Sequence, residues 1–262
     1  MIIIAGPCQL ESSQHAIDIA SELHSVCEEY DFQYYFKSSF DKANRTSVHG
    51  KRGPGMSKGL EWLNDVKTEV GCKVLTDVHE TWQLKEVAPI VDVLQIPAFL
   101  CRQTDLVQRS VEIANLLDKK VNIKKGQFLA PWDVKGILSK TGTENVWITE
   151  RGTSFGYNTL ITDFTGLQFM KKEYPVPIIF DATHSVQKPG GMGTSSGGNR
   201  DYVPGLIRAA VVQGVDGVFL ECHHNPDEAP SDGPNMVKMK HMKTILSEIC
   251  LLSEIKIKYD YD

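Results

Sequence analysis

Several features that would indicate a membrane, nucleic-acid or disulfide-stabilised protein are missing from this sequence of 262 residues. Its six cysteines include no Cys-x-x-Cys pair, which predicts free thiols in a reducing, cytoplasmic compartment. No apolar run is long enough to cross a bilayer, and the opening residues Met1–Ala5 predict a strand rather than a signal peptide. The net charge of −5 does not favour nucleic acid or an anionic membrane as a partner.

Short runs of β-branched and aromatic residues are present instead, and longer segments with helical periodicity follow them. The predicted strands are Ile2–Ala5, Gln33–Lys37, Lys73–Thr76, Val91–Gln95, Val121–Lys124, Val146–Thr149, Pro177–Phe180 and Gly217–Leu220. The predicted helices are Ser13–Tyr30, Ser57–Val70, Thr81–Ala88, Thr104–Leu117, Asp133–Ser139, Asp163–Glu173, Val203–Gln213 and Asn235–Leu252.

Strict alternation of strands and helices predicts a parallel sheet with right-handed crossovers. Eight strand–helix units in a chain of this length predict an α/β fold, a single (β/α)₈ TIM barrel that forms one catalytic domain over residues 1–262. An open doubly wound sheet is the alternative, but no Gly-x-Gly-x-x-Gly follows the first strand to support it.

Cationic side chains recur where the predicted strands end. Chemistry in a barrel takes place at this edge, in the loops that follow the strands. The cations are Lys37, Lys42, Arg45, Lys124 and Arg151. Any one of them could be an ordinary solvated ion-pair partner. Their joint occurrence in an acidic protein predicts a site for a substrate with several phosphate or carboxylate groups.

A second set of residues, from three strand ends and one loop, combines a thiol, an imidazole and two carboxylates: Cys8, His184, Glu221 and, in the loop, Asp232. This mixture of sulfur, nitrogen and oxygen donors suits a divalent Zn²⁺, Fe²⁺ or Mn²⁺ ion. Spacing alone does not establish a metal site. Cys8 could be a small buried apolar residue, His184 a general base or a core residue, and the carboxylates could pair with Lys or Arg.

The segment Lys37–Thr46 (KSSFDKANRT) and the later Arg52–Gly55 (RGPG) resemble the family of 3-deoxy-D-manno-octulosonate 8-phosphate synthases. The likeness covers nearly the whole chain and continues through six further motifs. These are DVH at 77–79, QIPAFL at 95–100, NIKKGQF at 122–128, TERG at 149–152, FDATHSVQ at 180–187 and SDGPN at 231–235.

The resemblance implies condensation of phosphoenolpyruvate with D-arabinose 5-phosphate and water, by a cytoplasmic homotetramer that supplies lipopolysaccharide biosynthesis. It implies that Lys37, Lys42, Lys124 and Arg151 bind phosphoenolpyruvate, against a pocket wall of Gln95, Pro97 and Ala98. It further implies that Asn44, Arg45 and Thr46 bind the sugar phosphate, that Arg102 reaches the sugar phosphate of a neighbouring subunit, and that Asp77 lies near the reacting centre.

The family has a metal-dependent form and a metal-independent form, and the latter carries Asn where Cys8 stands here. Cys8 together with His184, Glu221 and Asp232 therefore resembles the metal-dependent form. We expect Cys8, His184, Asp232 and Asp77 to act in catalysis, with a proton moved by His184 or Asp232. We expect the Gly-rich loop 187–199 to close over the sugar.

Two other functions remain open at the level of sequence. A 3-deoxy-D-arabino-heptulosonate 7-phosphate synthase would use erythrose 4-phosphate on a related barrel, although Asn44–Thr46 favours the longer sugar. A non-catalytic phosphosugar-binding barrel would tolerate loss of Cys8 and His184 and would release no phosphate.

Overall fold

Eight parallel strands close into a barrel in the computed structural model, which describes residues 1–45, 47–191, 193 and 196–255. Closure occurs where the first strand pairs with the last, so that Ile4 of β1 lies opposite Phe219 of β12 as well as Tyr35 of β2. The strands are β1 (Ile2–Gly6), β2 (Gln33–Lys37), β3 (Lys73–Asp77), β4 (Val93–Ile96), β5 (Lys120–Lys124), β6 (Val146–Glu150), β9 (Ile178–Asp181) and β12 (Gly217–His223). The predicted TIM barrel is confirmed.

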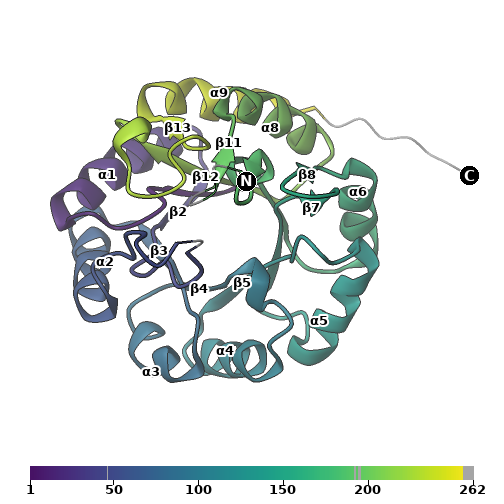
Figure 1. Ribbon diagram of the computed structural model, residues 1–262, viewed down its shortest axis with the longest axis horizontal. Coiled ribbons are helices and arrows are strands. Elements are labelled where there is room, and N and C mark those ends of the chain that lie inside the picture. Colours follow the sequence, from purple (N-terminus) through teal and green to yellow (C-terminus); the bar gives the residue numbers. More distant parts are fainter. Residues whose placement is uncertain (46, 192, 194–195, 256–262) are drawn as a thin grey trace, which may run out of the picture.

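Helices surround the barrel as an outer ring (Figure 1). Each crossover helix buries one apolar stripe against the outside of the strands, as Ala16, Ile19 and Leu23 do in the first. The helices are α1 (Ser13–Glu29), α2 (Met56–Val70), α3 (Leu84–Val87), α4 (Thr104–Leu116), α5 (Val134–Thr141), α6 (Phe164–Glu173), α7 (Ala182–Ser185), α8 (Val203–Val212) and α9 (Met242–Ser253). No helix in the described ranges is both long and apolar enough to span a bilayer.

The strands alternate between two hydrophobic clusters because successive side chains point to opposite faces. On β1, Ile3 and Ala5 pack outward against the helices, whereas Ile4 points into the barrel. The inner cluster is Ile4, Tyr35, Leu75, Val93, Trp147, Ile179 and Phe219. These side chains, called the apolar plug below, fill the lower barrel and support the layer of side chains above them.

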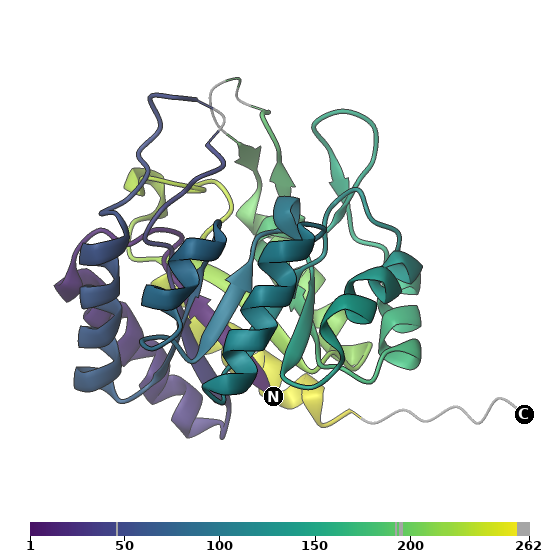
Figure 2. The same cartoon turned by 90° about the horizontal axis from the view of Figure 1, so that it is seen from below.

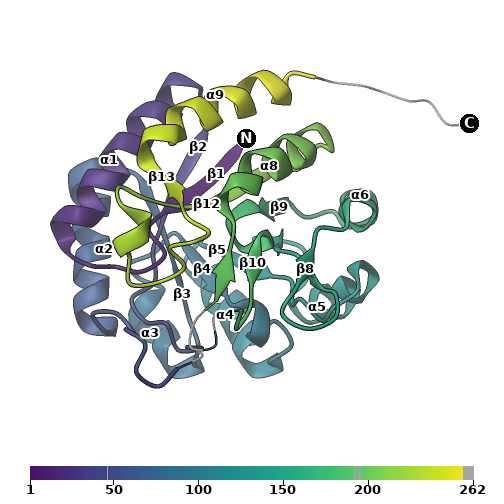
Figure 3. The ribbon, with the colours of Figure 1, turned by 45° about the horizontal axis from the view of Figure 1, so that its top comes forward.

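Short single-turn helices and two small hairpins elaborate the loops. The turns are η1 (Thr81–Gln83), η2 (Ala98–Leu100), η3 (Pro131–Asp133), η4 (Arg200–Tyr202), η5 (Pro226–Glu228) and η6 (Met239–His241). The hairpins pair β7 (Thr153–Ser154) with β8 (Leu160–Ile161) and β10 (Gln187–Lys188) with β11 (Gly197–Gly198). The long loops rise from one end of the barrel (Figure 2), and β8 and β10 stand over that end in the tilted view (Figure 3).

The prediction of one helix over Asn235–Leu252 is wrong before Met242. The segment β13 (Val237–Lys238) lies in parallel beside Cys222 and His223 of β12, so its backbone is extended there. The turn η6 follows, and α9 begins only at Met242. The backbone here pairs with the end of β12, some fifteen residues earlier in the chain, and this pairing overrides the local helical pattern. The edge of a strand offers backbone hydrogen bonds that the periodicity of the sequence does not reveal.

Candidate active site

A cavity of about 580 Å³ opens at the end of the barrel where the strands finish. Most of the residues that the sequence assigned to substrate or catalysis line it. They are Lys37, Lys42, Asn44, Arg45, Asp77, Gln95, Pro97, Ala98, Lys124, Arg151, His184 and Asp232. The strand ends therefore bring together side chains from every part of the chain, as the barrel fold requires.

Polar side chains form a layer directly above the apolar plug, because residues two apart on a strand share a face. Lys37 follows Tyr35, Asp77 follows Leu75, and Glu221 follows Phe219. The same step leads from Val93 to Gln95, from Trp147 to Thr149 and from Ile179 to Asp181. Strand alternation thus converts the sequence pattern into a polar floor for the cavity.

Two lysines of this floor are almost inaccessible to water and each has a carboxylate partner. Lys37 Nζ lies 2.6 Å from Glu221 Oε1, and Lys124 is paired with Asp181. Both ammonium groups stand over the ring of Phe219, with Nζ to centroid distances of 5.4 Å for Lys37 and 3.7 Å for Lys124. Cation–π attraction adds to the ion pairs here.

The two lysines differ in the direction of their pKa shifts. Burial lowers the pKa of each ammonium, but at Lys37 the attraction of Glu221 and Asp77 outweighs burial and raises the pKa. At Lys124 burial prevails over Asp181, and the positive charge of Lys37 adds to it, so the pKa is lowered. Arg151 is also buried, and burial lowers its pKa. A bound anion would relieve the repulsion among these cations.

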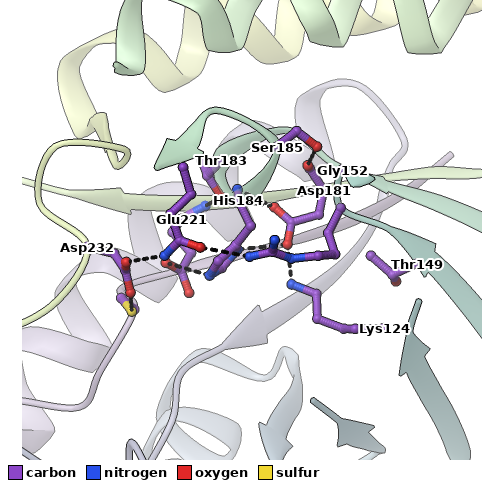
Figure 4. Close-up of polar contacts among 12 residues, drawn as sticks. Lys124, Thr149, Gly152, Asp181, Thr183, His184, Ser185, Glu221 and Asp232 are labelled. Carbon is purple, nitrogen blue, oxygen red and sulfur yellow. Dashed lines mark hydrogen bonds and ion pairs between the residues drawn. The ribbon is translucent and has the colours of Figure 1, made fainter. Parts of the chain in front are cut away.

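The predicted metal ligands gather at the β1–β12 side of the cavity (Figure 4). Donor atoms of Cys8, Glu221 and Asp232 all lie within 4.8 Å of one another, and Cys8 Sγ is 3.1 Å from Asp232 Oδ2. His184 Nε2 lies 3.6 Å from Glu221 Oε2, a buried oxygen with no hydrogen-bond partner. The sequence prediction that these four side chains meet is therefore consistent with the geometry.

The surrounding protein charges favour ionised carboxylates and a protonated thiol in this cluster. Burial raises the pKa of the Cys8 thiol, and the neighbouring Glu221 raises it further. Burial also raises the carboxyl pKa values, but Lys37 and His184 at Glu221, and His184 and Lys42 at Asp232, bring both below their ordinary range. A cation among these donors would favour the thiolate.

Asp181 orients His184 from behind. Its Oδ2 lies 2.7 Å from His184 Nδ1, and its Oδ1 accepts the backbone N–H of His184 at the start of α7. Burial alone would raise the pKa of Asp181, but His184 and Lys124 lower it well below its usual range. A carboxylate that holds one imidazole nitrogen leaves the other directed toward Glu221, as in many metal-binding histidines. Sequence reasoning assigned no role to Asp181, although it is the last residue of its strand.

Loop contacts connect Arg45 and Arg151 to the neighbourhood of the predicted metal ligands, Cys8, His184, Glu221 and Asp232, which are called the metal-type cluster below. Arg45 donates to Ser231 Oγ and to Gln9 Oε1, each at 2.7 Å. Gln187 donates to Asp232 Oδ1 at 2.7 Å and accepts from Arg151 at 2.8 Å. Gln187 was another residue without a predicted role, and only its place at the start of the Gly-rich loop pointed to it.

Three of the predicted residues that the structure describes, Arg102, Cys8 and Glu221, do not line this cavity. Arg102 is exposed, beyond η2, and does not line the cavity. Thr46 lies outside the described residues. Cys8 and Glu221 lie beneath the lining rather than in it, because both are fully buried.

A second compact group, Glu11, His15 and His223, could be mistaken for a metal site. The Nδ1 of His223 accepts the backbone N–H of Asn225, so its other nitrogen carries the ring proton. That nitrogen, Nε2, lies 2.9 Å from Glu11 Oε1 and donates to it. The ring therefore has no free lone pair for a cation.

Known proteins are similar to this chain over nearly its whole length. The model of the DAHP synthetase I family matches residues 1–256. A Granulibacter bethesdensis protein is 53% identical over 251 residues, covering 95% of this chain and 87% of that protein. One from a Chelativorans species is 53% identical over 258 residues, covering 97% and 92%, and one from Rickettsia canadensis is 52% identical over 251 residues, covering 95% and 90%. All three are named 2-dehydro-3-deoxyphosphooctonate aldolase.

Replacing Asp181 should test how strongly the floor depends on its buried ion pairs. We expect Asp181→Asn to lower the free energy of unfolding by about 3–5 kcal/mol, because Lys124 would remain buried without a counter-charge. Urea denaturation measures this. Asp227→Asn is the control, since it removes an exposed carboxylate paired with Arg200, and it should leave the midpoint unchanged. Equal losses in the two variants would contradict the prediction.

Proposed function

This chain belongs to the DAHP synthetase I family, and we propose that it condenses phosphoenolpyruvate with D-arabinose 5-phosphate and water. The products are 3-deoxy-D-manno-octulosonate 8-phosphate, a precursor for lipopolysaccharide, and inorganic phosphate. The names of the relatives at 52–53% identity support this reaction over the erythrose 4-phosphate alternative. The observation that carries the proposal is a set of buried cations converging on one cavity in an acidic protein.

Phosphoenolpyruvate binds among Lys37, Lys42, Lys124 and Arg151 in this proposal. Its phosphate and carboxylate supply the negative charge that four clustered cations require. Three of the cations are buried, so little side-chain freedom is lost when the substrate binds. Gln95, Pro97 and Ala98 line the wall beside it.

The sugar enters above, where Asn44 and Arg45 line the outer cavity. Arg45 is already fixed by Gln9 and Ser231, so its guanidinium is oriented before the sugar phosphate arrives. Asp77 faces the same cavity from the floor, as an acceptor for sugar hydroxyl groups. The Gly-rich loop contributes Gln187, Pro189 and Gly190 to the lining, and it excludes water from the bound sugar.

The chemistry forms one carbon–carbon bond and one carbon–oxygen bond, and it breaks the carbon–oxygen bond that joins C2 to the phosphate. C3 of phosphoenolpyruvate attacks the aldehyde carbon of the sugar, and water adds at C2. The resulting tetrahedral intermediate then loses phosphate by cleavage of its C2–O bond. His184 and Asp232, which both line the cavity, move the proton from the water toward the new sugar hydroxyl.

We also propose that Cys8, His184, Glu221 and Asp232 hold a divalent ion, Zn²⁺, Fe²⁺ or Mn²⁺. The fit rests on the donor set, on the mutual distances within 4.8 Å for three of the donors, and on the orphaned Glu221 Oε2. Such an ion supplies Lewis-acid polarisation of an oxygen when bound.

Phosphate release tests the reaction. We expect the purified protein to release inorganic phosphate from phosphoenolpyruvate with arabinose 5-phosphate, and at least tenfold more slowly with erythrose 4-phosphate, because a site that hydrogen-bonds a hydroxyl discriminates strongly against its absence. A colorimetric phosphate assay with both aldoses measures this. Faster release with erythrose 4-phosphate would favour the heptulosonate alternative, and no release with either would favour a binding protein.

Measurements of metal content and of activity together test the proposed metal site. We expect chelation to abolish phosphate release and Mn²⁺ or Zn²⁺ to restore it, since the proposed ion supplies the Lewis-acid polarisation of an oxygen. Cys8→Ala should lose both bound metal, measured by elemental analysis, and most activity. Cys250→Ala, on the outer helix α9, is the matched thiol control and should retain both. Activity that survives verified metal removal would overturn the metal proposal while leaving the reaction intact.

The protein is further proposed to act as a cytoplasmic homotetramer. Six free cysteines agree with a reducing compartment. Large apolar side chains are exposed in the loops after β3, β4, β5 and β6, on the side where Arg102 also lies: Trp82, Phe99, Phe128, Trp132 and Phe155. An apolar surface of this kind suits an interface between subunits.

Light scattering should give a mass near four times the 29.2-kDa chain. Arg102 does not line the cavity of its own chain, and in the proposed tetramer it reaches the sugar phosphate bound to a neighbouring subunit. We therefore expect Arg102→Ala to raise KM for the sugar phosphate without changing KM for phosphoenolpyruvate. A monomeric mass with full activity would refute the assembly.

A further inference from the structure

A line of four buried polar side chains crosses the polar floor from β3 to β6. Gln95 Nε2 donates to Asp77 Oδ1 at 2.6 Å, and Asn122 Nδ2 donates to Gln95 Oε1 at 2.8 Å. Thr149 Oγ1 donates to Asn122 Oδ1 at 2.6 Å. Asp77 and Gln95 line the cavity, whereas Asn122 and Thr149 do not and are fully buried. Thr149 is labelled at the right of Figure 4.

The donors in this line all point the same way, toward Asp77. An ionised carboxylate can only accept, so Gln95 must turn its NH₂ group toward Asp77 and its oxygen toward Asn122. Asn122 must then turn its NH₂ toward Gln95 and its oxygen toward Thr149, whose hydroxyl completes the line as a donor. Reversing either amide would bring two oxygens or two NH₂ groups together among buried side chains, which is costly.

Asp77 is held at both carboxylate oxygens. Gln95 binds Oδ1, and the hydroxyl of Ser39 donates to Oδ2. Burial alone would raise the pKa of Asp77, but Lys37, Lys42 and His79 around it lower the pKa well below its usual range. The carboxylate is therefore an ionised acceptor whose rotation is blocked, and its remaining lone pairs keep one direction in the cavity.

We propose that Asn122 and Thr149 are positioning residues that hold the Gln95 amide in the direction that the ionised Asp77 imposes, and through it hold Asp77 for the sugar substrate. The role in catalysis rests on the proposed function, whereas the coupling along the line does not. Asn122 supplies a donor to Gln95 Oε1, and Thr149 supplies a donor to Asn122 Oδ1. This support keeps Gln95 and Asp77 in one arrangement before the sugar binds.

The direction of the hydrogen bonds along this line can be tested by thermal unfolding, without an activity assay. In Asn122→Asp the new carboxylate accepts from both Thr149 and Gln95, which forces Gln95 Oε1 against Asp77. The same change is tolerated better in the Asp77→Asn background, because an amide at position 77 can reverse and donate to Gln95. We expect Asn122→Asp to lower the melting temperature at least twice as far in the wild-type background as in the Asp77→Asn background. Thermal unfolding of the four proteins measures this coupling between residues that do not touch.

Repulsion through space between two carboxylates could produce the same coupling, and Gln95→Met separates the two causes. Methionine has a similar size but cannot relay a direction. The coupling between positions 77 and 122 should largely disappear in the Gln95→Met background. Coupling that persists there, or coupling that is absent with Gln95 present, would overturn the proposal.

Kinetics test the catalytic part. Thr149→Val removes the terminal donor, and we expect kcat to fall about tenfold with KM for phosphoenolpyruvate within twofold. Thr149→Ser keeps the hydroxyl and should retain at least half of kcat. Ser110→Ala is the control for losing a buried hydroxyl, because Ser110 bonds Leu106 O in α4, away from the cavity. Equal kcat in the valine and serine variants would refute the positioning role. A wild-type protein that releases no phosphate would refute the proposed function, and the unfolding measurements would still decide the coupling.

Discussion

An ammonium group that is nearly inaccessible to water must keep a carboxylate beside it, and the barrel mouth is organised around this requirement at Lys37. Its partner Glu221 comes from the last strand and meets it across β1, where the barrel closes. The same carboxylate lies against His184 and beside Cys8. One buried ion pair thereby links barrel closure, the cations of the cavity and the cluster of Cys8, His184, Glu221 and Asp232.

Strand alternation makes this arrangement possible at low cost. The apolar plug fills the lower barrel, so the polar groups two residues further along each strand form a floor that rests on a rigid apolar base. Phe219 belongs to both regions, because its ring closes the plug and its face supports Lys37 and Lys124. Electrostatic attraction is stronger on such a floor than at the surface, which suits recognition of a multiply charged substrate.

Nearly every polar group of the floor serves two partners. Asp181 binds Lys124 and also orients His184, while Gln187 connects Arg151 with Asp232. The uncharged side chains in the line from Thr149 to Asp77 follow the same pattern, since each amide donates on one side and accepts on the other. These shared partners connect the cations of the cavity with the metal-type cluster, so a substitution in one group alters the electrostatic surroundings of the other.

The barrel and most of the cavity follow from the order of residues along the chain. Alternating apolar runs specify strands and helices, and a barrel places every strand end at one mouth, so Lys37, Asp77, Lys124 and His184 could be assigned there from position alone. Which of them pair depends on the folded chain. Lys37 and Glu221 are 184 residues apart, and no local pattern encodes their contact. The extended β13 in place of a predicted helix, the role of Asp181 and the direction of the amides likewise depend on neighbours from other strands. Hydrogen-bond direction is a property of the assembled network, because each amide is oriented by the groups on both its sides.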